Sequence, residues 1–348
     1  MTPTFALPAD AQATAPPEWR GMQRDEVRLM AVRPDGVASL RFRDLPELLE
    51  PGDLVVVNTS ATLPGRLAAR RTDGVTVPLH WSTELDDGDW VVELRRRDNS
   101  GPDLGCEPGT RLQLPGGAAL TLLSAYPDPA RPSRLWRART SPRLGATVYL
   151  PLHGTPIEYD HLQDDFDIGT FQNVYAAQPG SAEMASAGRP FTAELLVALM
   201  ARGVPVVPLT LHTGVSSPEL HEPPYPERFA VPEVTARLVN STRQAGRRVV
   251  AVGTTATRAL ETATGEDGVT RAAGGWTDLV LGPDRPARGV NGLITGLHEP
   301  EASHLQLLEA VAGPELVAAA YDRAVAEHYL WHEFGDSMLF LPRVRVRP

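Results

Sequence analysis

The chain has 348 residues, of which 42% are hydrophobic and 22% charged, so it can form one large domain or two smaller ones. Its formal charge of -10 argues against a large surface for a phosphate backbone, although short arginine-rich runs occur. The single cysteine excludes an internal disulfide and is typical of a reducing compartment. Neither a membrane-length apolar run nor a signal peptide is present, so we expect a cytoplasmic protein without membrane contact.

The sequence pattern of the first 150 residues changes at about residue 68. The segment FRDLPELLEPGD predicts a short helix, and LVVVN at 54–58 predicts a buried strand. From about 68 to 150, short apolar runs alternate with turn pairs such as Asp73-Gly74 and Asp87-Gly88. This spacing predicts an all-β barrel or sandwich. We therefore expect residues 68–150 to form a small inserted β-barrel-like domain whose two ends lie close together.

The chain after residue 150 alternates between helical and extended patterns. Helices are predicted over 191–202, 231–246, 254–263, 304–313 and 314–331, and strands over 204–212, 247–253 and 277–282. Alternating strands and helices indicate an α/β core. We expect residues 1–67 and 151–348 to form one α/β main domain around the insert.

The segment VVAVGTTATRALE predicts a strand that turns at Gly253 into a helix opened by Thr254 and Thr255. A glycine lets a ligand approach the backbone, and the unpaired N–H groups at a helix start favour an anion. Arg258, one turn further on, is suited to a carboxylate. The alternative interpretation is an ordinary helix start with a surface arginine.

Two histidines follow apolar strand-like or glycine-containing runs, namely His212 and His298. Polar residues at strand ends often line the ligand crevice of α/β folds, but a structural histidine explains either position as well. His328 and His332 have the spacing of two metal ligands on one helix face. No HExxH motif or cysteine cluster accompanies them, so we expect a packed helix there and no metal site.

Several segments resemble, in chain order, those of the S-adenosylmethionine:tRNA ribosyltransferase-isomerase family of queuosine biosynthesis. The resemblance covers nearly the whole chain outside the β insert, and it includes RDEVRL, FQNVYAAQPGSAEMASAGRPFT, VVAVGTTATRALE, NGLITGLHEPEAS and AYDRAVAEHYLWHEFGDSMLF. It implies an α/β domain with an inserted small β-barrel. It also implies transfer and isomerisation of the ribosyl part of S-adenosylmethionine onto a deazaguanine in tRNA, with release of adenine and methionine. S-adenosylmethionine would be a co-substrate, and no metal is implied.

The resemblance also suggests roles for individual residues. Candidates for proton transfer are His212, Glu227 and His298. Candidates for binding S-adenosylmethionine are Gly253, Thr254, Thr255, Arg258 and Thr295. Candidates for binding the acceptor are Asn58, Arg66, Gly188, Arg189 and Glu299.

The chain departs from the family pattern at several polar positions. Thr59 and Ala61 stand where the family has an aspartate and an arginine, Pro190 and Tyr225 stand where it has histidines, and the loop at 213–217 is rewritten. None of these four side chains carries the charge or proton of the group it replaces. The departures predict weak tRNA activity and favour, as alternatives, a small-molecule acceptor or a non-catalytic nucleoside-binding protein. The sequence indicates no particular oligomeric state.

Overall fold

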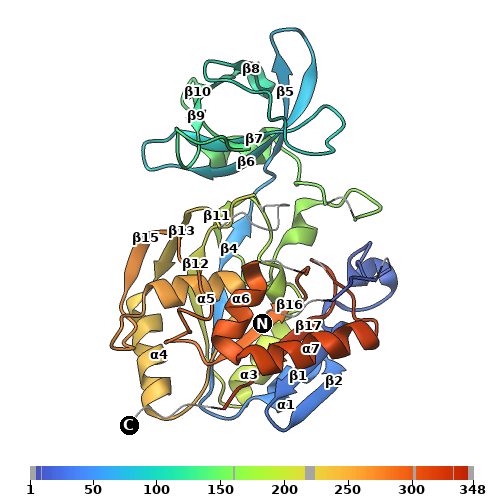
Figure 1. The fold of residues 1–348 in the computed structure, drawn as a ribbon, viewed down its shortest axis with the longest axis vertical. Helices are drawn as coiled ribbons and strands as arrows, with labels where there is room; N and C mark the ends of the chain where they lie inside the picture. Colours follow the sequence, from blue (N-terminus) through green and yellow to red (C-terminus); the bar gives the residue numbers. More distant parts are fainter. Residues whose placement is uncertain are drawn as a thin grey trace.

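The structure is a computed structural model that describes residues 5–8, 10–159, 161–215, 224–300, 303–331 and 333–343. It has two parts, a larger α/β domain and a smaller β-barrel that stands above it in Figure 1. This is the predicted fold class, an α/β main domain with a small inserted barrel.

The α/β domain is built on a nine-stranded mixed sheet with the order β15-β13-β12-β3-β14-β16-β17-β1-β2. The four central strands β12, β3, β14 and β16 are mutually parallel, while β13, β15 and β17 run against their inner neighbours. The strands of this sheet are β1 (Arg28–Arg33), β2 (Gly36–Arg41), β3 (Leu54–Asn58), β12 (Val206–Leu211), β13 (Glu227–Val231), β14 (Val249–Val252), β15 (Ala273–Thr277), β16 (Gly292–Gly296) and β17 (Ser337–Phe340).

Helices cover both faces of this sheet, which explains why the central strands β3 and β14 are buried along their whole length. Successive side chains of a strand point to opposite faces, so Leu54 and Val56 of β3 join one core while Val55 and Val57 join the other. The first core includes residues of α4 to α7, and the second includes residues of α1 and α3. These helices are α1 (Leu45–Leu48), α3 (Ala193–Ala201), α4 (Glu233–Gln244), α5 (Gly253–Thr262), α6 (Ser303–Ala312) and α7 (Pro314–Ala326).

The inserted domain is a closed antiparallel barrel with the strand order β10-β7-β6-β5-β8-β9. Its apolar interior includes Trp81 and Trp90, and helix α2 packs against it through Tyr149 and Leu150. The elements are β5 (Arg66–Arg71), β6 (Thr76–Glu84), β7 (Trp90–Leu94), β8 (Arg111–Gln113), β9 (Ala119–Ala125), β10 (Leu135–Ser141) and α2 (Ala146–His153).

The chain enters and leaves the barrel side by side. Arg66 and Thr155 exchange two backbone hydrogen bonds of 2.9 Å. On the α/β side of this crossing, β4 (Ser60–Thr62) and β11 (Gln178–Ser181) form a short parallel pair. The limits expected for the insert, residues 68 and 150, fall inside β5 and inside α2. The insert therefore interrupts the α/β domain between β3 and β12.

Two predicted elements differ in the structure. The strand expected over 277–282 lies earlier in the chain, since β15 ends at Thr277. After Thr277 the chain leaves the sheet, and the carbonyl of Leu279 accepts a hydrogen bond from Arg258. The helix expected to run to residue 331 ends at Ala326, and His328 has a φ of 51°. The prediction that His328 lies on a helix is therefore wrong, and His332 lies outside the described residues.

Among the described residues, none of the helices is both long and apolar enough to span a membrane.

Candidate active site at the carboxyl edge of the sheet

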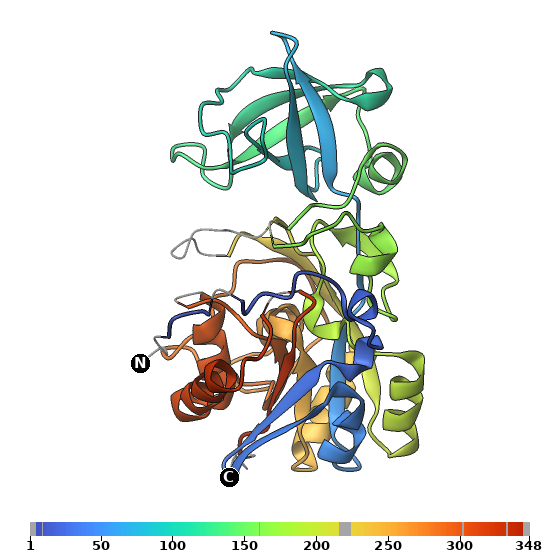
Figure 2. The same cartoon turned by 90° about the vertical axis from the view of Figure 1, so that its right-hand side faces the viewer.

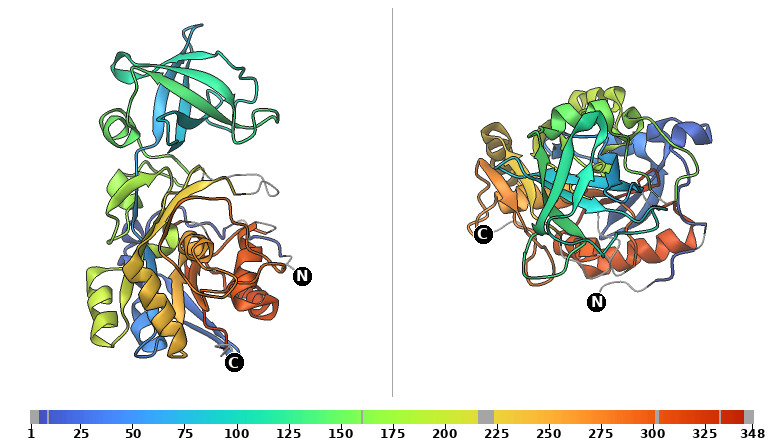
Figure 3. Two further views of the ribbon diagram at one scale, coloured as in Figure 1. Left: turned by 90° about the vertical axis from the view of Figure 1, so that its left-hand side faces the viewer. Right: turned by 90° about the horizontal axis from the view of Figure 1, so that it is seen from above.

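The carboxyl ends of four parallel strands meet at the edge of the sheet that faces the barrel (Figure 2). Asn58 ends β3, His212 follows β12, Gly253 follows β14, and His298 lies two residues beyond β16. Glu227 joins them because β13 runs in the opposite direction and begins at this edge. Seen from above, the barrel covers much of the sheet (Figure 3). Ligands of open α/β sheets bind at such carboxyl edges.

Asn58 ties three of these segments together. Its side-chain oxygen accepts hydrogen bonds from the backbone N–H groups of Leu211, at 2.9 Å, and Ser60, at 3.1 Å. Its amide nitrogen donates to the Leu211 carbonyl, at 2.8 Å, and to the Thr255 hydroxyl, at 3.2 Å. Since the side chain is buried, Asn58 fixes the relative positions of β3, β12 and α5.

His212 is held by a chain of hydroxyl groups. Its Nδ1 lies 2.7 Å from Ser60 Oγ, which in turn lies 2.5 Å from Ser181 Oγ. A Cβ atom at Gly180 would lie 2.6 Å from the imidazole, so a glycine is needed for β11 to pack on this ring. Burial lowers the pKa of His212, which favours the neutral imidazole at neutral pH.

Glu227 and Arg258 form an ion pair at the same edge. One carboxylate oxygen contacts Arg258 Nη1, and the other accepts a hydrogen bond of 3.3 Å from the N–H of Gly214. Burial raises the pKa of Glu227, and the positive charge of Arg258 opposes that rise. Arg258 also donates from Nε to the carbonyl of Leu279, while its buried Nη2 has no hydrogen-bond partner among the described residues.

Helix α5 begins at Gly253, and no side chain caps its first turn. Gly253 has a φ of 90°, in the left-handed region that favours glycine. A Cβ atom there would lie 3.3 Å from Ala187, which belongs to the short 3₁₀ helix η6 (Ser186–Gly188). Close packing at Gly188 is similar, since a Cβ atom there would clash with the hydroxyl of Tyr175. Thr254 and Thr255 are half-buried at this helix start.

His298 lies between Thr295 and a second histidine that the sequence did not indicate. Its Nε2 lies 2.9 Å from Thr295 Oγ1, and its ring stacks on that of His304, with centroids 4.6 Å apart and planes 6° apart. His304 keeps contact with solvent, but desolvation by the protein packed around its ring lowers its pKa to about 4. The positive charge of Arg258 adds to this shift. Glu299 is exposed beside this pair. His304 was missed because it looked like an ordinary residue of a predicted helix.

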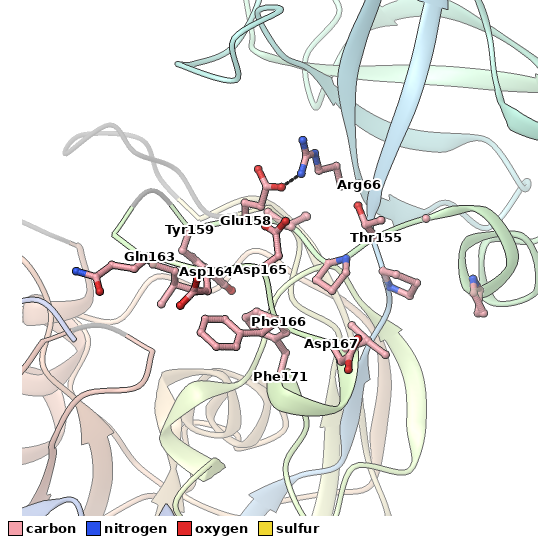
Figure 4. A pocket seen from close by; sticks show the side chains of 17 residues that line it. Arg66, Thr155, Glu158, Tyr159, Gln163, Asp164, Asp165, Phe166, Asp167 and Phe171 are labelled. Atoms are coloured by element: carbon pink, nitrogen blue, oxygen red, sulfur yellow. Dashed lines mark ion pairs between the residues drawn. The ribbon is translucent and has the colours of Figure 1, made fainter. Parts of the chain in front are cut away.

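Two of the predicted acceptor-binding residues lie apart from these segments. Arg66 forms an ion pair with Glu158, and both line a pocket of about 830 Å³ between the barrel and the segments 154–159 and 162–171 (Figure 4). Arg189 is buried, and it donates to Glu18 at 2.9 Å and to the carbonyl of Thr170 at 3.1 Å. Within the described part of the chain, no three histidine, cysteine, aspartate or glutamate side chains gather as metal ligands.

The fold and the candidate site together define an α/β protein with an inserted barrel, whose candidate functional residues gather at the carboxyl edge of the sheet. A sequence profile of the family described as queuosine biosynthesis protein matches residues 2–340. The chain belongs to this family.

Relatives that match over nearly their whole length carry one name. The S-adenosylmethionine:tRNA ribosyltransferase-isomerase of Acidithiobacillus ferrooxidans is 39% identical over 88% of each chain. The protein of the same name from Thermus thermophilus is 37% identical, over 91% of this chain and 93% of its own. A crystal structure of the S-adenosylmethionine tRNA ribosyltransferase from Thermotoga maritima covers 97% of this chain at 29% identity, with a TM-score of 0.53.

Proposed function

We propose that this protein is an S-adenosylmethionine:tRNA ribosyltransferase-isomerase. It would transfer the ribosyl part of S-adenosylmethionine to a deazaguanine in tRNA and isomerise it, with release of adenine and methionine. The observation that carries the proposal is the convergence of the family-like segments at one sheet edge, in a chain that is 37–39% identical to two enzymes of this name. The chain would work in the cytoplasm, where its proposed acceptor is found.

The residues at the carboxyl edge fit S-adenosylmethionine. The buried Nη2 of Arg258 is a donor suited to a carboxylate, and the uncapped start of α5 offers backbone N–H groups to a negatively charged group. We assign binding of S-adenosylmethionine to Gly253, Thr254, Thr255 and Arg258. Thr295 would act with them indirectly, because its hydroxyl is bonded to His298.

The sulfonium of S-adenosylmethionine acidifies the adjacent ribose carbon, so the reaction needs a base for that proton and an acid for the departing adenine. His212 suits the base, because burial favours its neutral form and the Ser60 hydroxyl fixes its Nδ1. Glu227 is the alternative candidate for the base, because its carboxylate lies at the same edge and burial holds its pKa above the usual range for a carboxyl group, nearer to neutrality. His298 is the third candidate, and its ring is fixed on one face by His304.

For the acceptor, we assign Asn58, Gly188 and Glu299 to shaping this edge of the sheet. Asn58 and Gly188 would do so by fixing the backbone around α5, as their packing indicates. Arg66 and Arg189 are engaged with Glu158 and Glu18, so we place their roles in the junction with the barrel and in the domain core.

The comparisons do not favour the small-molecule acceptor, despite the changes at Thr59, Ala61, Pro190 and Tyr225. One observation bears on Tyr225: its hydroxyl lies 3.4 Å from Ser133 Oγ, and its ring lies 5.5 Å from the guanidinium of Arg134, both in or beside the barrel. Tyr225, which replaces a histidine of the family pattern, therefore contributes to the contact between the two domains.

The test is to supply tRNA that carries the aminomethyl-deazaguanine, add S-adenosylmethionine, and analyse nucleosides by mass spectrometry. We expect the epoxide-bearing cyclopentane product in tRNA and one free adenine for each modified base. Ribosylation of the free base without turnover on tRNA would support the small-molecule acceptor instead. No turnover on either acceptor would contradict the proposed activity.

A further inference from the structure

The barrel contacts the segment that follows β12, immediately next to Glu227. Ser82, a buried residue of β6, accepts a hydrogen bond of 3.1 Å from the backbone N–H of Val215. The N–H of the preceding residue, Gly214, donates a hydrogen bond of 3.3 Å to the Glu227 carboxylate. Two successive backbone N–H groups therefore point to different domains, one to the barrel and one to the candidate site.

The fit between Ser82 and Gly214 is close. A Cβ atom at Gly214 would lie 2.6 Å from Ser82 Oγ, a distance at which one of the two groups must move. A glycine at 214 therefore lets the barrel strand approach near enough for the Ser82 hydroxyl to reach Val215. The backbone at Gly214 is not in the left-handed region, so the need for glycine here is steric.

Other barrel residues contact this segment and the neighbouring strands β13 and β15. Arg134 of the barrel donates to the carbonyl of Val215 at 3.3 Å while it forms a buried ion pair with Glu93. Asp86, in the turn between β6 and β7, pairs with Arg228 and accepts a hydrogen bond of 3.0 Å from Trp276. Both contacts lie close to Glu227, one along the chain after β12 and one along β13 and β15.

On the basis of the proposed function, we infer that the barrel completes the active site and that Ser82 is a positioning residue for Glu227. The Ser82 hydroxyl fixes the backbone at 214–215, and this backbone presents the Gly214 N–H to one carboxylate oxygen while Arg258 holds the other. A hydrogen bond to a carboxylate favours its ionised form. Among the described residues, Arg258 from α5 is the charged side chain that contacts the Glu227 carboxylate. Arg134 reaches only the carbonyl of Val215, and the pair of Arg228 with Asp86 belongs to the next position of β13, whose side chain points to the other face of the strand.

The inference is tested with Ser82→Ala, using the pH dependence of turnover as the readout. Loss of the hydroxyl should lower kcat about fivefold, the effect of one hydrogen bond. It should also move the acid limb of the kcat profile to higher pH, because the Glu227 carboxylate loses support for its charge.

A matched control removes another buried hydroxyl of the barrel. Thr140 accepts a hydrogen bond of 3.0 Å from the N–H of Leu144, within the barrel. Thr140→Val should lower the thermal stability as Ser82→Ala does, yet leave the pH profile in place. Equal shifts of the acid limb in both variants would mean that Ser82 acts only on barrel stability, and the inference would be wrong.

A second variant approaches the same contact from the other side. Gly214→Ala should lower kcat and shift the acid limb in the wild-type background, because its Cβ displaces the Ser82 hydroxyl. It should add little in a Ser82→Ala background, where that hydroxyl is absent. Full additivity would overturn the inference, and so would wild-type kinetics of both single variants. Absence of turnover in the wild-type protein, by contrast, would contradict the proposed function itself.

Discussion

The two domains use arginine–carboxylate pairs in different ways. In the barrel, Asp89 is fully buried and pairs with Arg137, Arg139 and Arg143, whose side chains are 37%, 48% and 49% exposed. In the α/β domain, Glu227 and Arg258 are only 14% and 9% exposed, and a buried nitrogen of Arg258 has no partner among the described residues.

The difference indicates that the Asp89 cluster stabilises the barrel, whereas the Glu227–Arg258 pair is a candidate ligand site. The barrel carboxylate has all the donors it needs, and its arginines keep solvent contact. The pair at the sheet edge is largely buried, and within the described part of the chain one nitrogen of Arg258 lacks a hydrogen bond, a state that is costly unless another group binds there. The comparison therefore predicts that equivalent substitutions in the two clusters will have different consequences.

The largest effect should come from Arg258→Ala. It removes the proposed carboxylate donor, so the affinity for S-adenosylmethionine should weaken by about 1.5–3 kcal/mol in calorimetry. It also leaves Glu227 buried without its cation, which should lower the free energy of unfolding by about 3 kcal/mol. Arg137→Ala is the control, because Asp89 keeps two other arginines, and it should change neither quantity by more than about 0.5 kcal/mol. Unchanged affinity in Arg258→Ala would place the ligand elsewhere.

Next in size are Glu227→Gln and His212→Asn, which should each lower kcat by roughly 10²-fold while the affinity for S-adenosylmethionine stays near that of the wild type. Burial raises the pKa of Glu227 from that of an ordinary carboxyl group and lowers the pKa of His212 from that of an ordinary imidazole. Both groups act as bases only when deprotonated, so activity should fall as the pH decreases through the region below about 6.5. Full turnover by either variant would remove that residue from the mechanism.

A smaller effect, confined to stability, is expected for Asp89→Asn. Hydrogen bonds from Arg139, and then from Arg137, lower the pKa of Asp89 to about 2. The stabilisation is therefore fully present above about pH 4 and is lost as the pH falls towards 2. The variant should unfold with a free energy about 2 kcal/mol lower at neutral pH. Its acid dependence should be flatter and its kcat unchanged. A large loss of kcat would show that this cluster also serves the reaction.

The smallest effect should come from His304→Leu. The folded protein holds the pKa of His304 at about 4, below that of a free histidine, so the unfolded chain binds its proton first as the pH falls. Stability should decrease between about pH 6.5 and 4 in the wild type, and His304→Leu should reduce that decrease. Urea midpoints measured at about pH 7 and about pH 5 provide the comparison. An identical decrease in the variant would mean that the stacked pair has no influence on acid stability.

The sequence by itself determined the fold class and several elements of the site. The central strands were predictable because a strand buried on both faces is a short apolar run, as at 54–58 and 249–252. The barrel was predictable because its strands are short and separated by turn pairs. The turn at Gly253 was predictable because a glycine between a strand and a helix commonly marks a backbone conformation that other residues adopt at a cost.

Only the tertiary structure decided which of these residues meet. The strand order places β12, β3, β14 and β16 next to one another, although their order in the chain is β3, β12, β14, β16, so the meeting of Asn58, His212 and Gly253 was not readable from spacing. Arg189 was assigned to the acceptor, but the fold turns it towards Glu18, 171 residues earlier in the chain. The stack of His298 on His304 and the reach of Ser82 to Val215 depend on where separate elements pack. Such contacts depend on how whole elements and domains pack, so they cannot be predicted from a local pattern of residues.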